Sequence, residues 1–248
     1  MATPRLLLLD IETAPAIVYT WGLFDVSIGI DQIIEPGRII CWGAKWLGKK
    51  EMLYADERVG KKKMFVQIHA LMSEADAIVT YNGDGFDLPK LNGAFVEHDL
   101  PPVPPSSSID LFKTVKTLGF QSNKLAFIAP FLKIGTKVKN EGFPLWSACL
   151  AGDATAWKRM QRYNAGDVSL LQGLYETLRP YIRNHPYLGS DSTAGGCPVC
   201  SSRRSQSQGV RRTKAFIIQR LQCQNCGSWY QGDRHKAGSP KALSSHAT

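Results

Sequence analysis

The N-terminal apolar run constrains the fold more than any other stretch. Four consecutive leucines, Leu6 to Leu9, precede Asp10, Ile11 and Glu12. Such a run is typical of a central strand covered on both faces. Because residues two apart on a strand point to the same side, Asp10 and Glu12 project together. Adjacent carboxylates repel each other, so the pair indicates a divalent cation with hard oxygen ligands. Alternatively, Asp10 caps a turn and Glu12 is solvated.

The composition describes a globular chain with a basic C-terminal part. Its 248 residues suffice for one substantial domain and a small one. There is no apolar run near the length of about 20 residues that spans a membrane, and no signal-peptide cleavage pattern, so we expect a cytoplasmic protein without a membrane partner. Residues 185–248 contain nine Lys and Arg against two acids, which is seven of the nine net positive charges. This asymmetry favours an acidic polymer as substrate.

The order of predicted elements indicates a mixed sheet with helices on both faces. After the first strand, we expect strands over residues 38–47, 51–55, 76–81 and 108–111. Helices are expected over residues 61–75, 86–98, 111–118, 124–132, 146–151 and 153–182. Residues 21–37 are interpreted as a loop. Its Trp21 and Phe24 either cover the sheet edge, which we favour, or stack on a base.

Two further motifs carry chemistry. In the first, a strand, a glycine-rich break and a helix start place Asp87 in a first helical turn, where its side chain could point toward Asp10. Charge compensation at the helix N-terminus is the simpler role for Asp87. In the second, Tyr163 and Asp167 are four residues apart and share one helix face. The simpler interpretation makes Tyr163 a core residue and Asp167 a surface charge.

Together, Asp10-x-Glu12, Asn82 with Phe86-Asp87, and Tyr163-x-x-x-Asp167 resemble the three exonuclease motifs of the DEDD superfamily. The tyrosine of the third motif is similar to that of the DEDDy branch. The second motif is similar to that of family B DNA polymerase proofreading domains and of stand-alone predicted exonucleases of bacteria and phages. The resemblance covers roughly residues 5–183 and implies an α/β, ribonuclease H-like fold.

The resemblance also implies an activity. It implies a 3′→5′ exonuclease that releases 5′-mononucleotides from nucleic acid, with DNA favoured over RNA, in a bacterial or phage-infected cytosol. Asp10, Glu12, Asp87 and Asp167 would hold two Mg²⁺ or Mn²⁺ ions, and Tyr163 would orient the attacking water. Thr13, Asn82 and Phe86 would contact the substrate. Two alternatives stay open: a non-catalytic nucleic-acid-binding module, and a proofreading or processing subunit that docks to a replication protein.

Four cysteines predict a second, structural metal site. Cys197, Cys200, Cys223 and Cys226 form two Cys-x-x-Cys pairs 22 residues apart, which is typical of a zinc ribbon with one Zn²⁺. We place ribbon strands at residues 215–221 and 228–231 and a basic loop at residues 201–214. The ribbon binds either nucleic acid or a protein. Its phosphate-binding candidates are Arg203, Arg204, Arg211, Arg212 and Lys214.

These observations predict four segments. Residues 1–187 form the exonuclease-like domain, residues 188–196 a flexible linker, residues 197–234 the zinc ribbon and residues 235–248 a disordered tail.

Overall fold

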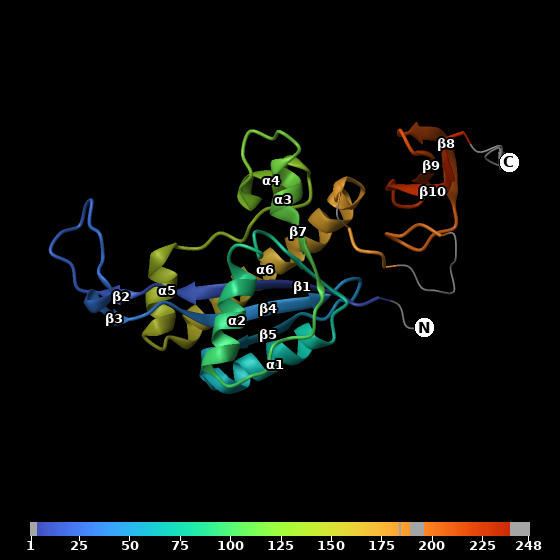
Figure 1. The fold of residues 1–248 in the computed structure, drawn as a ribbon. Coiled ribbons are helices and arrows are strands. Elements are labelled where there is room, and N and C mark those ends of the chain that lie inside the picture. Colours follow the sequence, from blue (N-terminus) through green and yellow to red (C-terminus); the bar gives the residue numbers. More distant parts are fainter. Residues whose placement is uncertain (1–3, 184, 189–195, 239–248) are drawn as a thin grey trace. The chain divides into compact units, whose positions relative to one another are not determined.

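The computed structural model describes residues 4–183, 185–188 and 196–238. The chain divides into two compact units, a larger one of residues 5–174 and a smaller one of residues 1–4 with 175–248. Each unit is built on its own sheet (Figure 1). Within the described residues, no helix combines the length and the apolar character needed to cross a bilayer.

The larger unit contains a five-stranded sheet with strand order β5-β4-β1-β6-β7. Its middle strand β1, Leu6–Ala14, begins with the four leucines, which are at most 5% exposed. The antiparallel side consists of β4, Arg38–Trp46, and β5, Leu53–Asp56, while β6, Ala77–Thr80, and β7, Ser107–Asp110, lie on the parallel side. The prediction of a buried central strand in a mixed sheet is therefore correct.

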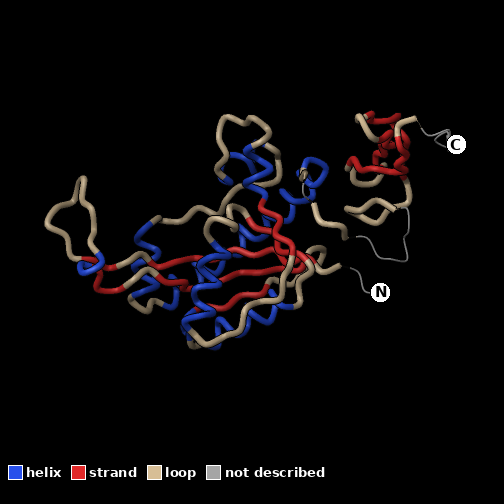
Figure 2. Tube along the Cα trace, viewed as in Figure 1, coloured by secondary structure: helices blue, strands red, loops and turns tan. Residues whose placement is uncertain are grey.

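Helices cover both faces of this sheet (Figures 1 and 2). On one face, Leu9 and Ile11 pack with residues of α1, Lys61–Ser73, and α2, Asp87–Glu97. On the other, Ile40 and Cys41 pack with α5, Phe143–Leu150, and α6, Ala154–Leu178. Since side chains alternate along a strand, Asp10 and Glu12 belong to the α5 and α6 face. Two short helices, α3 at Leu111–Lys116 and α4 at Leu125–Phe131, follow β7.

The segment between β1 and β4 differs from its prediction as a loop. It contains a two-stranded hairpin, β2 at Ile17–Val18 and β3 at Ile33–Glu35, with a 3-10 turn at Ile30–Gln32. Trp21 and Phe24 are almost fully exposed, so the favoured interpretation, that they cover the sheet edge, is wrong. The hairpin carries them away from the sheet, because its backbone pairs within itself.

The smaller unit contains a three-stranded antiparallel sheet with strand order β10-β9-β8. Its strands are β8, Ser205–Arg212, β9, Phe216–Cys223, and β10, Trp229–Lys236. The basic loop predicted at residues 201–214 is therefore largely a strand, because its backbone pairs with β9 from Ser205 to Arg212. Likewise β10 continues to Lys236, opposite Phe216, so the tail predicted to be disordered begins as a strand. The rest of that tail from residue 239, and linker residues 189–195, lie outside the described residues.

Candidate active site

The pairing of β1 leaves one of its edges open at the carboxylates. Strand β6 pairs only with Leu6 to Leu8, so the following residues of β1 have no strand on that side. Asp87, the first residue of α2, fills part of this gap: its Oδ1 accepts a hydrogen bond from the Ile11 amide at 3.1 Å. The sheet topology thus places Asp87 beside the strand that carries Asp10 and Glu12.

Three predicted carboxylates meet at the end of β1. Oxygen atoms of Asp10, Glu12 and Asp167 all lie within 4.8 Å of one another. Asp167 comes from α6 and is 4% exposed. Asp87 lies at the edge of β1 that β6 leaves unpaired. The four carboxylates therefore come from one strand and two helices that are far apart in the sequence.

Asn164 holds Asp10 in place, a role that the sequence did not predict. Its amide Nδ2 donates to Asp10 Oδ2 at 2.8 Å and to the Asp10 carbonyl at 3.3 Å. Gly43 lies opposite Asp10 in the sheet, and a Cβ there would be 1.9 Å from Asn164 Oδ1. Glycine at this position therefore leaves the space that the Asn164 side chain occupies. Asn164 belongs to the third motif, but nothing local indicates its partner on β1.

Burial and mutual repulsion make the ionised form of each carboxylate less favourable. Burial, then the charges of Asp87, Glu12 and Asp167, raise the pKa of Asp10. Burial followed by the charge of Asp167 raises the pKa of Glu12 to about 8. Burial also raises the pKa of Asp87 to about 6, against the lowering effect of the Ile11 amide. A site with these properties favours a bound cation, which would offset the repulsion.

Lys137 supplies the one positive side chain that the structure shows in contact with these carboxylates in the described residues. Its Nζ lies 2.8 Å from Asp167 Oδ2 and donates to the Tyr163 hydroxyl at 3.1 Å. Even so, burial keeps the pKa of Asp167 above its usual range. The Tyr163 ring also packs edge-on against Trp146, with centroids 5.9 Å apart. Lys137 lies in an irregular segment between α4 and α5, where no periodic pattern could have indicated it.

The second motif folds as a tight turn before α2. Asn82 has a φ of 68°, a conformation that asparagine tolerates better than most residues. A Cβ on Gly83 would be 2.2 Å from Thr80 Oγ1, so glycine is needed there. Buried Asp110 fixes the turn by accepting hydrogen bonds from the amides of Asn82 and Asp84 at 2.8 and 3.4 Å.

The predicted substrate contacts lie around this turn and the end of β1. Phe86 is 38% exposed as a residue, and Lys90 Nζ lies 4.9 Å from the centroid of its ring. Thr13 is half-buried and follows Glu12 across a bulge in β1. Within the described residues, no side-chain hydrogen bond or ion pair joins Thr13, Asn82 or Phe86 to Asp10, Glu12, Asp87 or Asp167.

The donor set fits divalent metal ions. Asp167 Oδ1 is buried and has no hydrogen-bond partner among the described residues, so it retains an unused acceptor beside Asp10 and Glu12. Carboxylate oxygens are the ligands that Mg²⁺ and Mn²⁺ prefer. Asp10, Glu12 and Asp167 could therefore share one ion, with Asp10 and Asp87 on the side of a second.

The four predicted zinc cysteines also come together. Their sulfur atoms lie within 4.8 Å of one another, with Cys197 and Cys226 3.7 Å apart and Cys200 and Cys223 3.6 Å apart. Backbone amides of Val199 and Asn225 donate to the sulfurs of Cys197 and Cys223 at 3.4 Å. Four clustered thiols with amide donors fit a closed tetrahedral zinc site.

The basic side chains of the ribbon are split between two ends of β8. Arg204 precedes the strand and its carbonyl accepts from the Gln224 amide at 2.8 Å, beside the cysteines. Arg211 and Arg212 end the strand, and Lys214 follows it. Eight residues of strand span about 25 Å, so the candidates form two groups, with Arg203 beside Arg204.

Comparison with known proteins identifies the family. A sequence model described as the RNase H superfamily matches residues 7–179. The chain belongs to this superfamily. The predicted ribonuclease H-like fold is therefore confirmed. There is no match among curated protein sequences.

Two solved structures are similar to this chain. The family B DNA polymerase from the hyperthermophilic archaeon Pyrobaculum calidifontis is 18% identical with a TM-score of 0.53, over 72% of this chain and 25% of the polymerase. RNase D from Trypanosoma brucei is 17% identical with a TM-score of 0.45, over 77% of this chain and 61% of the enzyme. The chain thus spans a quarter of the polymerase and less than two thirds of RNase D. The likeness to the polymerase is one of fold.

The raised pKa values predict how pH and metal affect stability. Glu12 has a pKa of about 8 when folded against 4.5 otherwise, so folding takes up a proton between these values. Stability from this group is therefore highest below pH 4.5 and falls as the pH rises toward 8. We expect the melting temperature of metal-free protein to fall over this range, and Mn²⁺ to raise it most at the upper end, where no proton need be displaced. Thermal melts across pH, with Glu12→Gln as a variant that lacks this titration, test this. A wild-type melt that responds to neither pH nor Mn²⁺ would contradict it.

Proposed function

We propose that this protein is a metal-dependent 3′→5′ exonuclease that releases 5′-mononucleotides, with DNA favoured over RNA. The observation that carries the proposal is the meeting of Asp10, Glu12 and Asp167 within 4.8 Å. Membership of the RNase H superfamily supports action on nucleic acid. The 3′→5′ direction rests on the motif resemblance to DEDDy exonucleases.

The carboxylates bind and position the metal ions in this proposal. Two divalent ions, when bound, supply an activated water and offset the charge of the phosphodiester as it is cleaved. The charges of Asp87, Glu12 and Asp167 all act on Asp10, and Asn164 fixes its orientation through a 2.8 Å hydrogen bond.

Tyr163 and Lys137 are proposed to act on the attacking water and on the negative charge of the substrate phosphate. The Tyr163 hydroxyl accepts a hydrogen bond from Lys137, and its own hydrogen bond to Asp167 lowers the pKa of that carboxyl. The hydroxyl thus lies beside the carboxylates, where it would contact a water molecule held by them. The Lys137 ammonium lies between this hydroxyl and Asp167, where it would stabilise negative charge on the substrate phosphate. We propose Tyr163 as the residue that orients the water and Lys137 as its partner.

The substrate end is proposed to lie over α2 and the end of β1. Phe86 offers a partly exposed ring on which a base can stack. Thr13 and Asn82 flank the carboxylates along the sequence and are proposed to contact the terminal nucleotide.

The ribbon is proposed to bind the nucleic-acid backbone. It would hold one structural Zn²⁺ through its four cysteines, and its two groups of basic residues would contact phosphates along β8. The chain is proposed to consist of an exonuclease-like domain at residues 1–187, a linker at 188–196 and a ribbon from residue 197. The ribbon strands extend to Lys236. Docking of the ribbon to a replication protein is the second function proposed for it.

The direct test is digestion of oligonucleotides labelled at either end. With Mg²⁺ or Mn²⁺, a 5′-labelled strand should give a ladder that shortens from its 3′ end, while a 3′-labelled strand should release labelled mononucleotide at once. Running single- and double-stranded DNA and RNA side by side ranks the substrates. Binding without any cleavage would support the non-catalytic alternative instead.

Asp10→Asn should reduce cleavage to background. The change keeps the shape of the side chain but removes the charge of a residue proposed to serve both metal ions. Binding of the oligonucleotide should persist, because phosphate contacts elsewhere carry it. Asp153→Asn is the matched control. Asp153 accepts hydrogen bonds from the first amides of α6, and asparagine can cap the helix in the same way. Near-normal turnover by Asp10→Asn would exclude the two-metal assignment.

Tyr163→Phe separates a catalytic tyrosine from a packing one. The ring and its contact with Trp146 remain, and only the hydroxyl is removed. We expect single-turnover cleavage to slow by a factor of about 10 to 1,000, the range for one positioned hydrogen-bonding group, with substrate affinity almost unchanged. A normal rate together with a lowered melting temperature would leave Tyr163 a structural role alone.

Neutralising the ribbon should weaken binding in a salt-dependent way. In the full chain, changing Arg211, Arg212 and Lys214 to glutamine should make the fall of log affinity with increasing log salt less steep. On a single strand the expected decrease is up to about 0.7 for each phosphate that the variant no longer neutralises. Lys49→Gln with Lys50→Gln, in the turn between β4 and β5, is the control. Equal slopes for the wild type and the triple variant would favour a protein partner for the ribbon.

A further inference from the structure

The three-stranded sheet of the smaller unit carries different side chains on its two faces. In an antiparallel sheet, residues two apart on one strand and residues directly opposite on neighbouring strands point to the same side. On the middle strand β9, Phe216, Ile218 and Arg220 therefore share one face. Arg211 of β8 and Arg234 of β10 both lie opposite Ile218, so they belong to this face as well.

Two residues of β10 complete this face. Trp229 lies opposite Gln222, and Lys236 lies opposite Phe216. We call it the arginine face, and its cations and aromatic residues are Arg211, Phe216, Arg220, Trp229, Arg234 and Lys236. The four cations are exposed, and Trp229 is 52% exposed. Tyr230 and His235, which alternate with them on β10, are only partly exposed. The arginine face is therefore the more open side of the ribbon sheet.

The positive charge of the arginine face is not neutralised by the protein. None of its four cations forms an ion pair within the described residues. Arg220 donates instead to the Gln208 carbonyl at 2.8 and 3.1 Å, which leaves its charge in place. The one acid on the three strands, Asp233, lies in the bulge of β10 and lines a groove together with Gln219, a residue of the opposite face. Four positive charges without a counter-charge favour a polyanion as the partner.

The aromatic rings of this face lie against its arginines. The guanidinium carbon of Arg234 is 3.5 Å from the centroid of the Phe216 ring, and that of Arg220 is 5.9 Å from the Trp229 ring. Arginine stems cover apolar surface while their charge stays in water, and Ile218 is accordingly only 5% exposed. Proteins that bind single strands stack unpaired bases on such rings and bind the phosphates with nearby cations. In a duplex, the faces of the bases are already stacked on one another.

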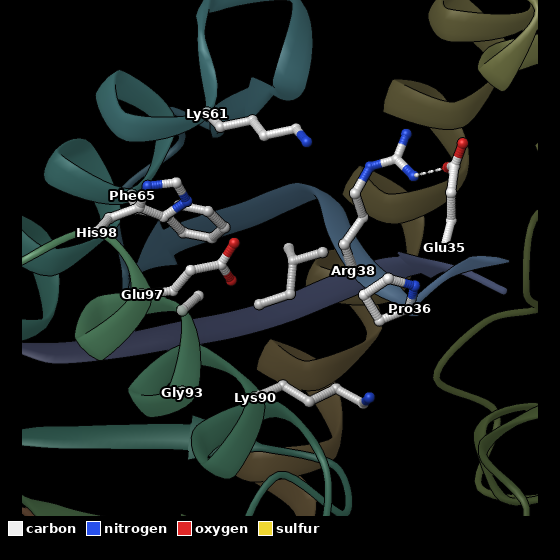
Figure 3. Close-up of a pocket in the computed structure, with 12 residues that line it drawn as sticks. Glu35, Pro36, Arg38, Lys61, Phe65, Lys90, Gly93, Glu97 and His98 are labelled. Atoms are coloured by element: carbon white, nitrogen blue, oxygen red, sulfur yellow. Dashed lines mark ion pairs between the residues drawn. The ribbon is translucent and has the colours of Figure 1, made fainter. Parts of the chain in front are cut away.

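A groove of the larger unit lacks this surplus of positive charge. It has a volume of about 580 Å³ and lies between the end of β3, the start of β4 and the helices α1 and α2 (Figure 3). Lys61 and Lys90 line it, but so do Glu35 and Glu97, and Arg38 is paired with Glu35 at 3.6 Å. Because charges of both signs surround this groove, it does not favour a polyanion as the arginine face does.

We propose that the arginine face binds a single strand of nucleic acid, with an unpaired base stacked on Trp229 and the phosphates bound by the four cations. The inference rests on the proposed function, because it names the surface through which the ribbon holds the substrate. It adds Arg220, Arg234 and Lys236 to the phosphate-binding residues and identifies the ring that contacts a base.

The test is the affinity of the full-length protein for labelled oligonucleotides, measured by fluorescence anisotropy in the Asp10→Asn background without Mg²⁺ or Mn²⁺. Trp229→Ala should raise the Kd for a single strand about fivefold to a hundredfold, the range for the loss of one stacked base. The Kd for a long blunt duplex should hardly change. Trp229→Phe keeps a ring and should restore most of the affinity. Zinc content and melting temperature, measured on each variant, show that the ribbon remains folded.

Two neighbouring arginines test which face of the ribbon binds. Arg211 belongs to the arginine face, whereas Arg212 lies opposite Ile217 on the other face. Arg211→Gln should therefore weaken single-strand binding several-fold more than Arg212→Gln, and it should make the dependence on salt less steep. Lys61→Gln removes one exposed positive charge from the groove of the larger unit and should leave the affinity unchanged.

Either of two results would overturn the proposal and leave this face to a protein partner: a single-strand affinity that Trp229→Ala does not change, or equal affinities of the Arg211→Gln and Arg212→Gln variants. Because binding is measured without cleavage, these results are separate from the nuclease activity. A wild type that binds a single strand through this face but cleaves nothing would contradict the exonuclease alone.

Discussion

The mutual repulsion of wholly or partly buried carboxylates at the end of β1 is the constraint on which the site depends. Asp10, Glu12 and Asp167 lie within 4.8 Å of one another, and burial removes the water that would screen them. The fold opposes this repulsion with the Asn164 amide at Asp10, the Ile11 amide at Asp87 and the Lys137 ammonium at Asp167. The apolar start of β1 then holds the carboxylates in place, since Leu7, Leu8 and Leu9 are fully buried.

The sequence predicted the parts of this arrangement that follow from local periodicity. Four leucines before Asp10 indicate a buried strand, and Asp167 lies four residues after Tyr163 on the predicted helix. What the sequence could not show are contacts between distant segments. Gly43 has no local reason to be glycine, and only its position opposite Asp10, beside Asn164, explains it.

Two loop predictions failed for a related reason. Strand β8 has the sequence Ser-Gln-Ser-Gln-Gly-Val-Arg-Arg, which lacks the apolar alternation of a half-buried strand, and its pairing with β9 stabilises it instead. The prediction for residues 17–35 failed in the opposite way, because the apolar residues of this hairpin suggested burial against the sheet. Backbone pairing between Ile17 and Glu35, and the hydrogen bonds of Gln32, turn those residues outward. In both segments, backbone hydrogen bonds that the side-chain pattern does not encode decide the structure.

Lys137 shows why the protein's own charges leave room for a metal ion. Its ammonium lies 2.8 Å from Asp167 Oδ2, yet the pKa of Asp167 stays raised because burial outweighs this contact. The same lysine lowers the pKa of Glu12, but burial and the charge of Asp167 raise it by more, so the pKa of Glu12 is about 8. One positive charge is thus too little for four carboxylates, and the remaining repulsion is relieved either by protons or by divalent ions. Asp167 Oδ1 has no hydrogen-bond partner within the described residues and belongs to the group whose oxygens lie within 4.8 Å of one another, so an unused acceptor for such an ion is already in place.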